Sequence, residues 1–122
     1  MPWIYEQKSG FLLSPSGQIV TKGYSGAPGY VDNPDDEAMQ NKGPLPRGVY
    51  SIAAPQDTKA HGPYALALNP HPGNEEFGRG GFMIHGDSIE NPGTASEGCV
   101  ILSRTAREQI WNSGDHQLTV VA

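Results

Sequence analysis

Glycine and proline interrupt this chain so often that they decide what it can fold into. The 122 residues include 16 glycines and 11 prolines, more than one residue in five. Both residues are poorly tolerated inside helices and are typical of tight turns. Because this fraction stays just below the range in which disorder is expected, the pattern predicts a single ordered domain over residues 1–122, with short elements and many tight loops.

Charge and hydropathy exclude several classes of protein. Lys and Arg number 8 against 13 Asp and Glu, the formal net charge is −5, and the mean hydropathy is −0.48. Scattered cations on an acidic chain do not form the clustered positive surface that nucleic acids and anionic membranes require. The chain has no apolar run long enough to span a membrane, and its first eight residues lack the basic start and apolar middle of a signal peptide. We therefore expect no nucleic-acid or membrane partner, and synthesis in the cytoplasm without a signal peptide.

Short apolar runs predict a mainly β fold. Two short helices are expected between them: one begins at Pro34 after Asn33 as its cap, and one covers 104–112 after Ser103 and ends at Gly114. About seven strands and two helices indicate a β-sandwich or a barrel-like domain. The runs are 3–7, 11–13, 18–21, 49–53, 64–68, 82–85, 99–102 and 117–121.

Metal chemistry is not favoured by the sequence. A single cysteine, Cys99, excludes an intramolecular disulfide and a zinc site built on several thiolates. His61 and His71 lie in loops rich in Pro and Gly, and His116 lies at a helix-to-strand turn; no pair has the close spacing of a zinc motif. We expect these three to be solvated loop histidines, and we expect no metal and no other cofactor.

His85 and Cys99 stand apart. His85 ends the apolar run 82–85, and Cys99 begins the run 99–102 after the 13 residues of the 86–98 loop. Such a loop returns its ends to neighbouring strands, which would place an imidazole beside a thiol. An imidazolium lowers the pKa of a neighbouring thiol, so that the nucleophilic thiolate exists at neutral pH. The plain alternative is a buried cysteine and a strand-end histidine with structural roles only.

The segment that joins these two residues resembles the active-site signature of L,D-transpeptidase (YkuD-like) catalytic domains. That signature is a His-Gly pair, a dozen or more residues, and then Ser/Thr-x-Gly-Cys followed by an aliphatic residue. This chain has His85-Gly86-Asp87 and then Ser96-Glu97-Gly98-Cys99-Val100. Segment 43–52 looks like the Pro-Gly-strand element that precedes the catalytic half in this family. Segments 3–5, 23–26 and 103–111 look like a compact branch of the superfamily, which includes type VI secretion effectors that attack peptidoglycan. The chain departs from the family at Glu97, where many members have His, and at Ile101, where they have Arg or Asn.

The resemblance implies a role for each matching residue. Cys99 would be the nucleophile, and His85 the general base and then the acid. Ser96 would support the imidazole through its main chain or its hydroxyl. The amides of Gly98 and Cys99 would form an oxyanion hole.

Three residues outside this core are candidates for binding substrate. Arg79 would bind a carboxylate through its planar fork, Asp87 would steady the loop or orient the site, and Tyr24 would line the cleft. Their plain alternatives are a solvated arginine, a turn aspartate and a packed tyrosine. Arg104 and Arg107 are more simply charges on the surface of the helix.

The implied activity is cysteine acyl transfer on peptidoglycan stem tetrapeptides. With water as acceptor it is an L,D-carboxypeptidase, and with a D-amino acid or another stem it is an L,D-transpeptidase. By the same resemblance, the protein would be an antibacterial type VI effector that acts in the target-cell periplasm, with delivery proteins and a cognate immunity protein as partners. Two other classes stay open: a non-catalytic wall-binding or phage-structural module on the same fold, and a cysteine peptidase of proteins.

Overall fold

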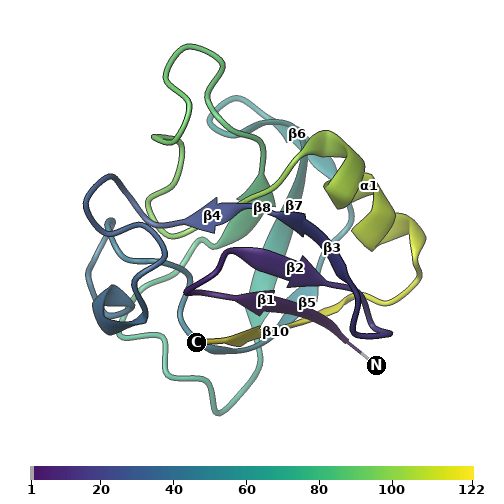
Figure 1. Ribbon diagram of the computed structural model, residues 1–122, viewed down its shortest axis with the longest axis horizontal. Helices are drawn as coiled ribbons and strands as arrows, with labels where there is room; N and C mark the ends of the chain where they lie inside the picture. Colours follow the sequence, from purple (N-terminus) through teal and green to yellow (C-terminus); the bar gives the residue numbers. More distant parts are fainter. Residues whose placement is uncertain (1) are drawn as a thin grey trace.

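The computed structural model describes residues 2–122, and its ten strands form one sheet (Figure 1). The sheet has the order β3-β2-β1-β10-β5-β7-β8-β9-β4, and β6 pairs with β7 outside this path. The helical elements are η1 (Pro34–Asp36), a 3-10 turn, and α1 (Arg104–Asn112). The strands are β1 (Trp3–Glu6), β2 (Phe11–Leu13), β3 (Ile19–Lys22), β4 (Tyr24–Ser25), β5 (Gly48–Ile52), β6 (Gln56–Thr58), β7 (Gly62–Pro70), β8 (Met83–His85), β9 (Val100–Ile101) and β10 (Gln117–Val121).

The expected mainly β fold is confirmed, with three differences. The short strands β4 and β6 carry no apolar run, and they form only because β9 and β7 lie beside them. The first expected helix is a single 3-10 turn, in which Asn33 accepts a hydrogen bond from the Asp35 amide at 3.1 Å. The edge strands β3 and β4 are separated only by Gly23 but are not paired within residues 2–122, so the sheet is not closed into a barrel.

The helix α1 is fixed at both ends. Ser103 accepts a hydrogen bond from the Ala106 amide at 3.2 Å, which caps its first turn. Near its other end, the Trp3 indole N–H donates to Ser113 Oγ at 3.0 Å, which joins the helix to β1. Ala106 and Ile110 are buried in the main core, and α1 lies against β7 and β8. The helix therefore supports the strand that carries His85. No helix among residues 2–122 has the length and apolar character needed to cross a membrane.

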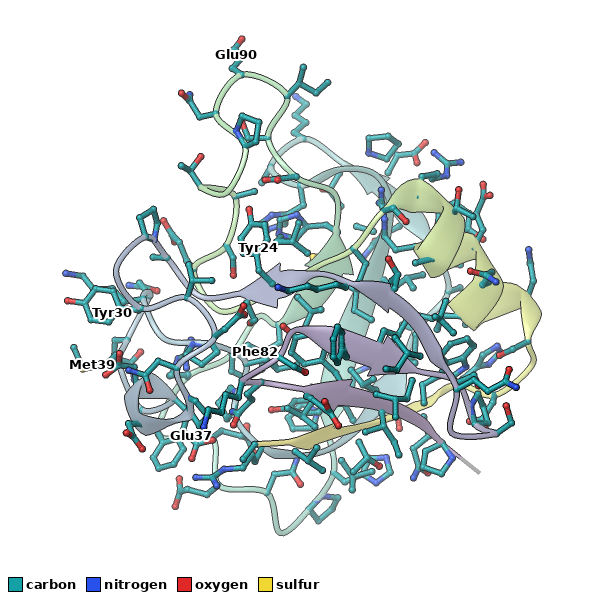
Figure 2. All side chains as sticks on the ribbon, in the orientation of Figure 1. Tyr24, Tyr30, Glu37, Met39, Phe82 and Glu90 are labelled. Carbon is teal, nitrogen blue, oxygen red and sulfur yellow. The ribbon has the colours of Figure 1, made fainter. Side chains whose placement is uncertain are left out.

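Strands β8 and β9 are parallel neighbours, an arrangement that determines where the chemically interesting residues lie. Ile84 pairs with Val100 and His85 with Ile101. Parallel strands need a long connection. Here it is the 86–98 loop, which extends from the sheet at the top of Figure 1 and has Glu90 near its outer end in Figure 2.

Candidate active site

The structure places His85 and Cys99 on one face of the β8–β9 pair. Met83 and His85 alternate along β8 and therefore share one face of it, and Cys99, which immediately precedes β9, packs against Met83. No hydrogen bond joins the two side chains among the described residues. Both are buried, with His85 2% and Cys99 8% exposed.

The His85 ring is oriented by its own loop. Nδ1 lies 2.9 Å from the Gly86 carbonyl oxygen, so Nδ1 carries the proton and donates it. Nε2 is then the unprotonated nitrogen; it is buried and has no hydrogen-bond partner within residues 2–122. Burial lowers the pKa of His85 below its usual value, the charges of His61 and Arg107 lower it further, and Gly86 and Asp87 raise it. The site therefore holds a neutral imidazole with a free lone pair.

His61 covers one face of this ring. It lies in the turn between β6 and β7, where its amide donates to Thr58 Oγ1 at 2.8 Å. Its ring stacks on that of His85, with centroids 4.5 Å apart and an interplanar angle of 30°. The expectation of a solvated loop histidine is wrong for His61. The same expectation did not include two contacts of the other loop histidines. His71 Nε2 lies 2.7 Å from Ser51 Oγ, and the His116 ring stacks on that of Trp111 with centroids 3.8 Å apart.

The Cys99 thiol lies in a small apolar cluster with Ala65 and Met83. Burial raises the pKa of Cys99, a hydrogen bond with the Met83 backbone lowers it, and Glu97 raises it while Arg79 lowers it. The expected lowering of the thiol pKa by an imidazolium is thus wrong in direction, because burial outweighs the opposing contributions and His85 is itself held neutral. The pair rests as a thiol and a neutral imidazole.

Ser96 fixes the turn that presents Cys99. Its buried hydroxyl donates to the Cys99 carbonyl oxygen at 2.6 Å and accepts from the amides of Gly26 at 2.9 Å and Gly98 at 3.2 Å. The expectation that Ser96 supports the imidazole through its hydroxyl is therefore wrong, since the hydroxyl holds the turn before Cys99 instead. The Gly98 amide is engaged in the same network, so of the two amides expected in an oxyanion hole, that of Cys99 remains as a candidate.

Arg79 lies beneath this turn and does not face solvent. It is 7% exposed, and its two terminal nitrogens donate to four carbonyl oxygens. These belong to Glu37, Gly43 at 2.9 Å, Pro44 at 2.8 Å and Glu97 at 3.3 Å. Gly98, at φ +136°, has no room for a Cβ beside the guanidinium. Because its terminal donors are used, Arg79 is not free to bind a substrate carboxylate as predicted. It joins the 37–44 segment to the end of the 86–98 loop.

Replacing Arg79 with methionine is expected to lower the free energy of unfolding by about 3 kcal/mol or more, because buried carbonyls lose charged donors. Urea denaturation measures this change. The matched control is Arg104→Met, which removes an exposed arginine paired with Glu108 and is expected to cost at most about 0.5 kcal/mol. Equal losses in the two variants would contradict the structural role of Arg79.

Tyr24, which Figure 2 shows near the base of the 86–98 loop, and Asp87 hold this loop by hydrogen bonds. The Tyr24 hydroxyl donates to Asp87 Oδ1 at 2.6 Å and accepts from the Ala95 amide at 3.0 Å. Asp87 also accepts from the amides of Ser88 at 2.8 Å and Gly93 at 3.1 Å. Burial, followed by the Asp87 hydrogen bond, raises the pKa of Tyr24 to about 12, so the phenol stays a donor. Both residues line a cleft, and the role that the structure supports for Asp87 is to steady the loop.

Two hollows meet at the site. The larger, of about 960 Å³, is lined by His85, Gly86 and Arg107, and the smaller, of about 360 Å³, by Gly98 and Cys99. They share Ala60, His61, Thr94 and Ala95 as lining residues. Cys99 therefore lines one hollow and His85 the other, and the β6–β7 turn and the end of the 86–98 loop lie between the two hollows. No cluster of three metal-ligating side chains occurs within residues 2–122.

Two residues at the site were not expected there. His61 gave no signal in the sequence, because its ring reaches His85 only through tertiary packing. Arg107 was expected as a surface charge but is 6% exposed. A signal for it exists: it follows the buried Ala106 and lies three residues before Ile110, on the apolar face of α1.

Comparison with known proteins gives one family and two similar folds. The family model described as the Tlde1 domain matches residues 19–122. The helical cell shape determining protein Pgp2 from Campylobacter jejuni aligns at 18% identity with a TM-score of 0.60, over 98% of this chain and 46% of that one. An L,D-transpeptidase (residues 123-326) from Xylanimonas cellulosilytica DSM 15894 aligns at 18% identity with a TM-score of 0.54, over 97% and 58% of the two chains. The chain thus spans about half the length of these structures. No curated protein is significantly similar to it. The expected L,D-transpeptidase fold is confirmed.

Proposed function

Because the chain belongs to the Tlde1 domain family, we propose that it is a cysteine acyl-transfer enzyme that acts on peptidoglycan stem tetrapeptides. Residues 1–122 act as one catalytic domain, with Cys99 as nucleophile and His85 as general base and acid. The observation that carries this proposal is that a buried thiol packs against Met83, on the face of β8 that also holds a buried imidazole with a free Nε2. The fold that the chain shares with an L,D-transpeptidase supports the same reaction class.

The reaction proceeds in two transfers. His85 Nε2 takes the thiol proton while Cys99 Sγ bonds to the carbonyl carbon of the third stem residue. The tetrahedral intermediate collapses when the C–N bond to the terminal D-alanine breaks, and His85 gives its proton to the leaving amine, so a thioester remains. Water then attacks the thioester with His85 as base, which returns the thiol and releases the tripeptide acid. A D-amino acid amine in place of water gives exchange.

The neutral resting pair supports this order of events. A buried thiolate would be costly here, because burial outweighs the nearby charge of Arg79, so the proton leaves Sγ as the new bond forms. The Nδ1–H donated to Gly86 holds the tautomer that leaves Nε2 free to accept it. The Ser96 network keeps the Cys99 turn in place during the transfer.

The biological setting follows from the family resemblance. We propose an antibacterial effector, delivered by the type VI apparatus into the periplasm of a target cell. Trimming and exchange of stem peptides would weaken the wall there. Delivery proteins and an immunity protein that covers the site are the implied partners.

The direct test is mass spectrometry of products from purified disaccharide tetrapeptide, with and without a D-amino acid. Release of D-alanine or its exchange supports the proposal. A folded protein that leaves this substrate unchanged, both with water and with a D-amino acid as acceptor, indicates a wall-binding module instead. Cleavage of an unfolded protein substrate but not of the tetrapeptide indicates a cysteine peptidase of proteins.

Activity is expected to be independent of bound metal. The proposed chemistry uses only Cys99 and His85, so EDTA should leave the rate of D-alanine release unchanged, whereas thiophilic ions such as Hg²⁺ should inhibit by binding the thiol. Loss of activity on chelation that zinc restores would overturn this expectation.

A further inference from the structure

Arg107 has one guanidinium nitrogen that the fold does not use. Nε donates to the Ser103 carbonyl at 3.3 Å, and Nη1 donates to the carbonyls of Pro63 at 2.9 Å and Tyr64 at 3.0 Å. Nη2 makes no hydrogen bond within residues 2–122, although Arg107 as a whole residue is only 6% exposed. Nη2 lies against Gly86, since a Cβ placed on that residue would be only 2.9 Å from it. The fold therefore holds a charged, unused donor beside the residue that follows His85.

The cleft around this nitrogen has a positive balance of charge. The larger hollow is lined by the cations Lys22, Arg104 and Arg107, and by the acids Asp87 and Glu90. The Asp87 carboxylate already accepts from a phenol and two amides. Glu90 lies near the outer end of the loop, away from the sheet (Figure 2). The inner part of the cleft therefore suits an anionic group of a ligand.

The proposed reaction identifies the anionic group of the substrate that would reach Nη2 of Arg107. His85 protonates the leaving amine, so the departing residue must lie beside His85. In an α-amino acid the carboxylate is one carbon away from that amine. The next residue of the chain is Gly86, which has no side chain and leaves Nη2 of Arg107 within reach.

We propose that Arg107 binds the terminal carboxylate of the residue that leaves the stem peptide, and equally that of an amino acid that enters by exchange. This inference rests on the proposed function and names its leaving-group subsite. The subsite takes a free α-carboxylate and rejects an amide or a longer peptide at that position. An Arg–carboxylate hydrogen bond is charge-assisted, which makes the preference large.

Neither of the other nearby arginines fits this role. Arg79 has its terminal nitrogens on four carbonyls, and Arg104 lies over the Tyr64 ring at 4.5 Å and pairs with Glu108. Arg104 is nevertheless on the same helix and lines the same cleft, so it is the matched control for a general effect of positive charge.

The test is binding of the stem tetrapeptide and of its C-terminal amide to the Cys99→Ala protein, measured by isothermal titration calorimetry. The acid is expected to bind about ten- to a hundredfold more tightly than the amide. Adding Arg107→Gln should reduce this ratio to within about twofold, and adding Arg104→Gln should keep most of it. Gly86→Ala is the second variant: its methyl group would lie 2.9 Å from Nη2, so the guanidinium must move away from the subsite, and the same preference should be lost.

The outcomes separate the inference from the proposed function. If the wild-type protein releases D-alanine but the Cys99→Ala protein binds acid and amide equally, the subsite is wrong and the function stands. If Arg107→Gln weakens both ligands by the same factor, Arg107 is structural and the inference fails. If the wild-type protein neither binds nor cleaves any stem peptide, the proposed function itself fails. Circular dichroism shows whether Arg107→Gln has folded. If it has not, the ratio of acid to amide affinity in Gly86→Ala decides whether the subsite exists.

Discussion

Replacing Cys99 with alanine is expected to abolish release of D-alanine from the tetrapeptide while the fold is kept. The thiol is the only one in the chain, so no other sulfur can form the thioester. The substitution removes one buried atom from the small cluster with Ala65 and Met83, which should cost about 1 kcal/mol of unfolding free energy. Mass spectrometry of muropeptide products measures the activity, and urea denaturation followed by circular dichroism measures the stability.

The matched variant is Cys99→Ser, which keeps the shape of the side chain and replaces the sulfur with a much weaker nucleophile. It should fold as well as the alanine variant and should show at least about a thousandfold loss of activity, since the uncatalysed steps that remain depend on binding and orientation alone. Retention of wild-type activity in either variant would remove Cys99 from the mechanism. If the alanine variant loses both its activity and its folded state, the activity of the serine variant decides whether Cys99 is the nucleophile.

The mainly β fold could be predicted because the signals for it are local. Alternating apolar residues mark the strands, and Ser103 and Gly114 mark the ends of α1. The strands β4 and β6 escaped prediction, since they are short and depend on partners that are distant in sequence. The sheet order, with β10 between β1 and β5, likewise depends on tertiary pairing rather than on any local pattern.

For the candidate site too, features set by the local sequence could be predicted, and features set by tertiary packing could not. His85 and Cys99 were found because they follow one another within a motif and end or precede short apolar runs. Their pKa values could not be predicted, because the direction of each shift depends on burial by segments elsewhere in the chain. Arg79 was misjudged for a related reason. A Gly-rich segment suggests exposure, yet the guanidinium is covered by the carbonyls of the 37–44 segment.

Replacing His85 with alanine is expected to lower the rate of D-alanine release at neutral pH by about 10²- to 10⁴-fold, the usual contribution of a general acid–base group. The pH profile gives the sharper test. Burial lowers the pKa of His85, so the wild-type rate should already have risen at a pH below the ordinary histidine value. Burial also raises the pKa of Cys99, so the descending limb, where the proton needed by the leaving amine is lost, should lie above the ordinary thiol value.

In His85→Ala the ascending limb at low pH should disappear, because that limb reports deprotonation of the imidazole. Alkylation of Cys99 by iodoacetamide should then increase only at a pH above the ordinary thiol pKa, where hydroxide removes the thiol proton, because burial raises the pKa of Cys99. Two further histidine variants are matched to it. His71→Ala, whose ring contacts Ser51, should leave the profile unchanged. His61→Ala should move the ascending limb to higher pH, because it exposes the His85 ring and removes a charge that lowers its pKa. Identical alkylation profiles in wild type and His85→Ala would show that the imidazole does not serve the thiol, and Cys99 would then be a structural residue of a β-rich binding module.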